Sequence, residues 1–180
     1  VVLVRQFIHQ ADLERPLGGH HLARHQQAFG AIRAHHASHQ ALDAFERLWE
    51  NGSDLNYVIV GREGWKGVAT EHRAYIASLC ERLENHPLLN KKLWWLKSAE
   101  DDLLLGLYQQ AMGVLVPSRE EGYGLPLIEA ANYGAPLLVR QLPVFQEVAG
   151  SHAEYFEGNE AAELAIAIEK WQDKLRNNQA

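Results

Sequence analysis

From about residue 38 onward, stretches with apolar residues at helical spacing alternate with short runs of consecutive apolar residues. The helical spacing and its end signals predict helices at about 38–50, 70–85, 99–111, 125–133, 144–149 and 159–177. Ser38 is the expected N-cap of the first helix, and a capping box at Ser98–Asp101 is expected to open the third. The short apolar runs predict buried strands at 56–60, 93–96, 113–117, 136–140 and 154–156.

This regular alternation predicts an α/β fold, a Rossmann-like doubly wound parallel sheet with helices on both faces. Such sheets bind their ligands beyond the carboxyl ends of the strands. The loops after Val60, Leu96 and Pro117 are therefore the expected site. We expect one domain at residues 38–180, because 180 residues are too few for two ordinary domains.

Residues 1–37 are expected to be a linker and an irregular, histidine-rich segment that leads into the first strand, with a weak strand near 28–32. The stretch from about residue 15 to residue 39 holds six of the ten histidines: His20, His21, His25, His35, His36 and His39. The i, i+4 spacing of His21 with His25, and of His35 with His39, would suit zinc ligands on a helix. No cysteine assists them, and an irregular segment is the favoured interpretation.

Composition narrows the function classes. The chain carries a net charge of −6, with 22% charged and 47% hydrophobic residues, and it has no long Lys/Arg run, which argues against a nucleic-acid partner. No stretch reaches the roughly 18 apolar residues of a membrane span. Cys80 is the only cysteine and is expected in the core, so an internal disulfide is impossible and a reducing, cytoplasmic location is expected. Because the chain lacks an initiator Met, we expect a piece of a longer protein.

The most informative segment is Pro117–Ala130, where a glycine-containing loop leads directly into a helix. Gly122 and Gly124 permit close backbone approach, and the free N–H groups of the helix start favour a phosphate. Glu121 in the loop and Glu129 one turn into the helix can face one cleft, where carboxylates would accept hydrogen bonds from sugar hydroxyls. Two ordinary surface acids are the alternative, but the apolar residues around Glu129 favour the functional interpretation.

The spacing of Glu121 and Glu129 within Glu121–Ala130 resembles the signature of retaining glycosyltransferases of family 4, which have the GT-B fold. The resemblance extends over roughly residues 38–175. It includes the segments 58–65, 107–108, 134–136 and 143–150, whose form is most similar to bacterial mannosyltransferases of surface polysaccharide synthesis. It identifies the chain as the C-terminal, donor-binding domain of such an enzyme, without the N-terminal acceptor domain.

The resemblance also implies residue roles. Glu121 and Glu129 would be the catalytic pair, with Glu121 on the donor sugar and Glu129 on the ribose of the nucleotide. The other implied contacts to the nucleotide-sugar come from Gly61, Arg62, Trp95, Leu96, Gly122, Tyr123, Gly124 and Leu125. Arg62 could equally lie on a solvated loop, and at least one of Trp94 and Trp95 is expected to be a core or surface aromatic without a site role.

The activity that the resemblance implies is transfer of a hexose, mannose from GDP-mannose above all, with retention and without a metal or other cofactor. The acceptor would be a saccharide or a lipid-linked saccharide bound through the N-terminal domain. The isolated chain is therefore expected to lack useful transfer activity. The longer protein would act in the cytoplasm, with peripheral association at the inner face of the membrane.

One departure from the family pattern supports a second hypothesis. Family members carry an Arg and a Lys for the diphosphate at the positions of His35 and His36, and neutral imidazoles grip a diphosphate less strongly. A non-catalytic nucleotide-sugar-binding or scaffolding domain is therefore the alternative. A sugar-nucleotide epimerase of the same architecture fits the fold but not the spacing of Glu121 and Glu129.

Overall fold

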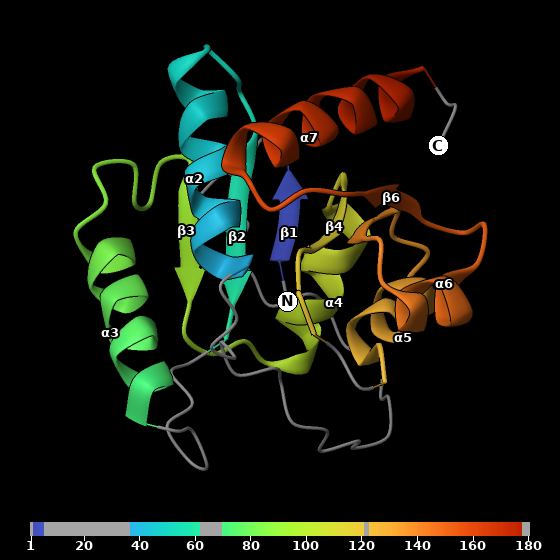
Figure 1. Ribbon diagram of the computed structural model, residues 1–180, viewed down its shortest axis with the longest axis horizontal. Coiled ribbons are helices and arrows are strands. Elements are labelled where there is room, and N and C mark those ends of the chain that lie inside the picture. Colours follow the sequence, from blue (N-terminus) through green and yellow to red (C-terminus); the bar gives the residue numbers. More distant parts are fainter. Residues whose placement is uncertain (1, 6–36, 62–69, 121–122, 178–180) are drawn as a thin grey trace.

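The fold is a six-stranded sheet flanked by helices, in the strand order β3-β2-β1-β4-β5-β6 (Figure 1). The structure, a computed structural model, describes residues 2–5, 37–61, 70–120 and 123–177. Its strands are β1 (Val2–Arg5), β2 (Asn56–Val60), β3 (Leu93–Leu96), β4 (Gly113–Val116), β5 (Leu137–Arg140) and β6 (Glu154–Phe156). Its helices are α2 (Ala37–Glu50), α3 (Thr70–Glu84), α4 (Asp101–Gln110), α5 (Leu125–Asn132), α6 (Pro143–Ala149) and α7 (Ala161–Arg176).

The direction of the strands agrees with the predicted fold class except at the centre of the sheet. The pairs β2–β3, β4–β5 and β5–β6 are parallel. β1 runs antiparallel to both of its neighbours, β2 and β4. It lies within residues 1–37, where the sequence predicts a linker. A four-residue apolar run suits a buried strand, but it carries no information about strand direction. The sequence therefore did not predict that this segment pairs antiparallel at the centre of the sheet.

Alternation along the strands divides the core into two layers. In β2, Tyr57 and Ile59 belong to one hydrophobic cluster and Val58 and Val60 to the other, as the two-residue period of a strand requires. The first cluster packs residues of α2, α3 and α7, and the second packs residues of α4, α5 and α6. Helices on both faces explain why β2 and β4 are buried along their whole length.

Helix starts differ from the sequence-based expectation in two places. α2 already begins at Ala37, so Ser38 lies inside the helix and is not its N-cap. The predicted capping box at Ser98–Asp101 is wrong, because Glu100 is the N-cap of α4 and makes no side-chain capping bond. A capping box that the sequence analysis missed opens α7, where Glu160 and Glu163 cap each other's backbone N–H.

Membrane crossing finds no support among the helices that the structure describes, since none combines the length and the apolar character of a span. Cys80 is buried in α3, as expected for a core residue.

Gly113 provides a test of the packing between β4 and α7. A Cβ at this position would stand 2.2 Å from Cη2 of Trp171 and 2.9 Å from the carbonyl oxygen of Pro136. Overpacking of this kind costs about 1–3 kcal/mol. We expect Gly113→Ala to lower Tm by about 2–12 °C in a thermal unfolding experiment, because a domain of this size loses about 2–4 °C per kcal/mol.

The matched control is Gly134→Ala, where φ is +65° and no atom lies within 4 Å of the added Cβ, so backbone strain of about 1 kcal/mol is its only cost. In the background of Trp171→Phe, the smaller ring should reduce the loss caused by Gly113→Ala. Strictly additive losses in the double variant would contradict the steric explanation.

Candidate functional site

The predicted site loop is built around the backbone of Gly124. Its φ of +65° is left-handed, a conformation that glycine adopts without a steric penalty, and it is the N-cap of α5. The Gly124 carbonyl accepts hydrogen bonds from Leu127 N at 2.9 Å and Ile128 N at 3.4 Å. The N–H groups of Tyr123, Gly124 and Leu125 donate to no other residue in the described part of the chain. Together with the positive end of the helix, they form a candidate anion-binding backbone at the carboxyl end of β4.

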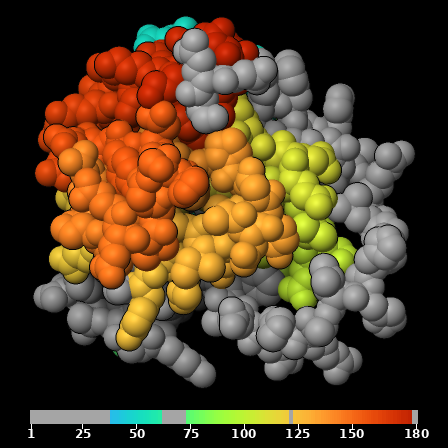
Figure 2. Space-filling view, turned by 90° about the vertical axis from the view of Figure 1, so that its right-hand side faces the viewer, coloured from blue at the N-terminus to red at the C-terminus, as the bar shows by residue number. Residues whose placement is uncertain are grey.

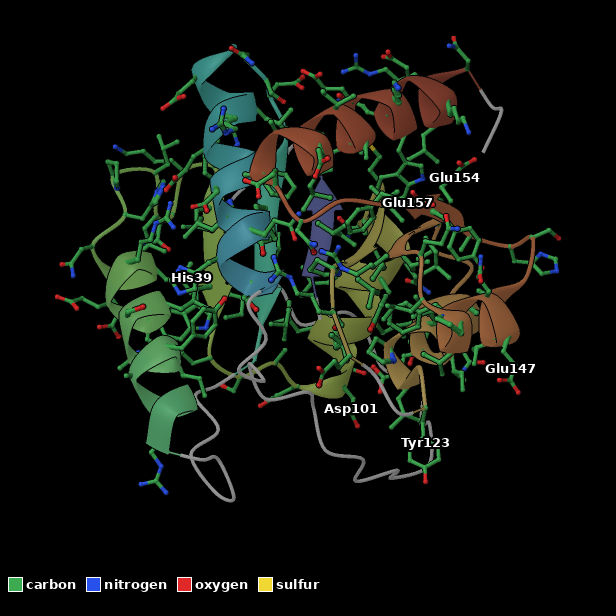
Figure 3. All side chains as sticks on the ribbon, viewed as in Figure 1. His39, Asp101, Tyr123, Glu147, Glu154 and Glu157 are labelled. Atoms are coloured by element: carbon green, nitrogen blue, oxygen red, sulfur yellow. The ribbon has the colours of Figure 1, made fainter. Side chains whose placement is uncertain are left out.

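The side chains around this backbone point to solvent. Tyr123 is 80% exposed and Leu125 is 57% exposed. Figure 3 shows Tyr123 projecting away from the protein at the edge where β2 and β3 end, the edge at which Asp101 also lies. With these two side chains turned to solvent, the backbone amides are the groups here that a ligand could contact, and the role of residues 123–125 stays a prediction.

Glu129 lies one turn inside α5 and is half-buried. The hydroxyl of Tyr108, from α4, donates a hydrogen bond to Oε2 of Glu129 at 3.4 Å. The apolar spacing around Tyr108 and its place in the resemblance give no sign of a partner in Glu129. No local pattern could have revealed the pair, because it joins two helices through tertiary packing.

The carboxyl ends of β2 and β3 bring together three further predicted site residues. The backbone N–H of Gly61 donates to the Leu96 carbonyl at 2.9 Å, and the Trp95 indole N–H donates to the Gly61 carbonyl at 2.9 Å. Nζ of Lys97 stands 4.5 Å from the centre of the Trp95 ring, a cation–π contact. Trp94, by contrast, is buried and donates to Asn56 Oδ1 at 3.2 Å, so it is the core member of the pair.

Several predicted site residues lie outside the part of the chain that the structure describes. Glu121, Gly122 and Arg62 are among them, as is the histidine-rich segment with His35 and His36. The weak strand at 28–32 lies there too. For these residues the roles implied by the resemblance stay predictions. His39 is described, and its ring lies edge-on against Tyr75 in α3, 4.4 Å between ring centres.

Arg140 supports the base of the site loop from the end of β5. It is 6% exposed and donates from Nε to the Pro117 carbonyl at 3.0 Å, where the loop begins. Its other two nitrogens donate to the Gly158 carbonyl and to Oε1 of Gln40 in α2. Burial, and after it the charge of Arg119, lower the pKa of Arg140. The sequence offers one signal for this network, a cation at the end of an otherwise apolar strand.

A groove of about 630 Å³ lies away from these residues, between α5 and α6 at the amino end of β5. Its walls include Ile128, Val148 and Trp171, and it includes none of the predicted site residues. Figure 2 views the side of the molecule on which α5, α6 and α7 lie next to one another. Because ligands of parallel sheets bind at the carboxyl edge, we do not assign the donor to this groove.

Metal-ligand clusters are missing from the part of the chain that the structure describes, where no three His, Cys, Asp or Glu side chains come together. The expectation of a metal-independent site is not tested by this geometry and stays a prediction.

Comparison with known proteins identifies the family. The sequence profile described as "Glycosyl transferases group 1" matches residues 28–179. The serotype-specific mannosyltransferase WbdA of Escherichia coli is 46% identical over 132 residues, which is 73% of this chain and 15% of WbdA. The O-antigen chain mannosyltransferase RfbU of Salmonella typhimurium is 27% identical over 150 residues, 83% of this chain and 37% of RfbU. The chain therefore spans only a small part of the length of these relatives.

A solved structure supports the fold. A UDP-forming α,α-trehalose-phosphate synthase from Burkholderia xenovorans superposes with a TM-score of 0.66 at 19% identity, over 83% of this chain and 37% of the synthase. At this identity the likeness speaks for the architecture alone, and it confirms the α/β, GT-B type of fold expected from the sequence.

Proposed function

The chain belongs to the glycosyl transferases group 1 family, and from this we propose that it is the donor-binding domain of a retaining mannosyltransferase. In the proposal the longer protein transfers mannose from GDP-mannose to a saccharide or lipid-linked saccharide during synthesis of a surface polysaccharide. It does so without a metal, in the cytoplasm or at the inner face of the membrane. The finer assignment to glycosyltransferase family 4 rests on the Glu121–Ala130 signature.

One observation carries the proposal: a half-buried carboxylate, Glu129, lies one turn behind the open backbone amides of residues 123–125. A carboxylate accepts hydrogen bonds from the two adjacent hydroxyls of a ribose. The backbone amides and the positive end of the helix stabilise the negative charge of a diphosphate. The donor therefore lies with its ribose at Glu129 and its diphosphate over the start of α5.

The base of the nucleotide lies toward the ends of β2 and β3 in this proposal. β2 and β4 are two strand spacings apart, about 10 Å, with β1 between them. In the proposal the base extends from the ribose at Glu129 toward the cluster of Gly61, Trp95 and Leu96. Arg62, which follows Gly61 in sequence, adds a bidentate contact to phosphate, and Glu121 binds hydroxyls of the sugar.

Catalysis in the proposal is electrostatic. The diphosphate leaves as negative charge builds on its oxygens, and the preorganised amides at the start of α5 stabilise that charge. The acceptor hydroxyl attacks the anomeric carbon on the face from which the diphosphate departs, which retains the configuration. The proposal assigns no residue as a covalent nucleophile.

Mannose is proposed as the sugar because both relatives described above are named mannosyltransferases. The test is a transfer assay on the longer protein that contains this domain. It should move labelled mannose from GDP-mannose to a mannan oligosaccharide, form an α linkage, and do so equally well in EDTA. UDP-glucose should not serve as donor.

Failure of transfer with every donor, while the nucleotide still binds, would contradict the enzymatic proposal and favour the non-catalytic binding domain. Transfer that requires a divalent metal would contradict the electrostatic mechanism but not the donor-binding role.

A further inference from the structure

Tyr108 is held more firmly than a tyrosine on a helix surface. It is 1% exposed within the hydrophobic layer formed by α4, α5 and α6. Its ring stacks on Tyr133 at the end of α5, with 4.9 Å between ring centres and 26° between ring planes. Because packing fixes the ring, the direction of the hydroxyl is fixed as well.

The hydroxyl of Tyr108 donates to Oε2 of Glu129 at 3.4 Å, a long hydrogen bond. Burial, and after it the charge of Glu129, raise the pKa of Tyr108 well above its usual value. The phenol therefore stays protonated at any pH at which the protein would be assayed. It is a hydrogen-bond donor to the carboxylate throughout.

The choice of acceptor is informative. Tyr155, a second tyrosine near the same layer, donates its hydroxyl to backbone carbonyls, that of Gly150 at 2.7 Å and that of Phe145 at 3.3 Å. Neutral carbonyls thus suffice to satisfy a tyrosine hydroxyl in this fold. Tyr108 instead donates to a half-buried carboxylate. Partial burial of a carboxylate costs free energy unless its charge is paired or accepts hydrogen bonds from a ligand.

A carboxylate has room for about four hydrogen bonds. When the protein holds one carboxylate oxygen, the free acceptor positions face outward in a defined direction. Binding of a ligand then costs less free energy, because the carboxylate is already ordered. Adjacent hydroxyls on a ribose are spaced to meet the two oxygens of one carboxylate. A freely rotating carboxylate would lose part of this selectivity, because it would engage a single hydroxyl almost as well.

We propose that Tyr108 is a positioning residue that fixes the Glu129 carboxylate to accept both hydroxyls of a ribose, so that the site selects ribonucleotides over deoxyribonucleotides. This inference rests on the proposed function, since it requires that a nucleotide binds at Glu129. It adds to it the group that sets selectivity for the ribose.

The test measures the affinities of the chain for GDP, 2′-deoxy-GDP and 3′-deoxy-GDP by calorimetry. The wild-type protein should prefer GDP over each deoxy form by about 10-fold or more, since a hydrogen bond to a charged group carries roughly that factor. In Tyr108→Phe this preference should shrink by a factor of about 3 to 10, because the affinity for GDP falls while the affinities for the deoxy forms stay almost unchanged. Tyr155→Phe, the matched control, should leave the preference at its wild-type value.

The outcomes separate the two ideas. If Tyr108→Phe weakens GDP and the deoxy forms equally, Tyr108 has a structural role and the inference is overturned, whereas the proposed function stands. If the wild-type protein binds GDP without preferring it to the deoxy forms, Glu129 does not hold the ribose, and the proposed role of Glu129 fails together with the inference. Full retention of the preference in Tyr108→Phe would also overturn the inference.

Discussion

Replacement of Glu129 by alanine is expected to weaken nucleotide binding by about 100-fold or more. Two charge-assisted hydrogen bonds to ribose hydroxyls would be lost, each of about 1.5–3 kcal/mol, and every 1.4 kcal/mol is a factor of ten in affinity. Glu129→Gln should lie between alanine and the wild type, because the amide keeps one acceptor but not the charge. Calorimetric titration with GDP measures both.

The fold should tolerate this change. Alanine is the best helix former, and Glu129 is only half-buried, so the main structural cost is the loss of a partner for the Tyr108 hydroxyl, about 1 kcal/mol. Glu147→Ala is the matched control, since Figure 3 shows Glu147 pointing outward from α6. Equal affinity for GDP in Glu129→Ala and Glu147→Ala would exclude Glu129 from the site.

Arg140→Met should produce the second large effect, a loss of about 3 kcal/mol of stability. Methionine fills a similar volume but leaves the Pro117 carbonyl and Gln40 Oε1 without their donor, and leaves the Gly158 carbonyl only the long bond from Gln40 Nε2 at 3.5 Å; each of the three lost bonds costs a net of about 1 kcal/mol. The guanidinium also lies over Phe156, 4.9 Å from the ring centre. Thermal unfolding should show Tm lowered by about 6–12 °C.

Arg140→Met should also weaken nucleotide binding, because Pro117 begins the loop that carries the open backbone amides. Arg176→Met is the matched control, since this arginine is 49% exposed and its nearest acid, Asp54, is 3.8 Å away. Its effect on stability should stay under about 0.5 kcal/mol. A similar loss of Tm in both variants would contradict the importance of the Arg140 network.

The sequence predicted the fold well wherever hydrophobic period and turn residues agree. β2 is an example, because four consecutive apolar residues closed by Gly61 specify a strand buried on both faces. Strand β1 shows the limit. Its residues suit a strand, yet the pairing with β2 and β4, and its antiparallel direction, depend on long-range contacts that no local pattern encodes.

The candidate site divides in the same way. Gly124 and the start of α5 were predictable, because a left-handed glycine followed by Pro126 is a local signal for a helix N-terminus. The pair of Tyr108 with Glu129 and the contacts of Arg140 join elements that are distant in the sequence. Such contacts follow from how helices pack on the sheet, and the sequence alone carries no sign of them.

Whether the carboxyl edge of the sheet binds a nucleotide-sugar can be measured by calorimetric titration of this chain with GDP, UDP, ADP and GDP-mannose in EDTA. We expect saturable binding at one site, with GDP and GDP-mannose preferred, and loss of that binding in Glu129→Ala. Absence of binding by all of these ligands to the folded chain, or binding that Glu129→Ala leaves intact, would contradict this expectation.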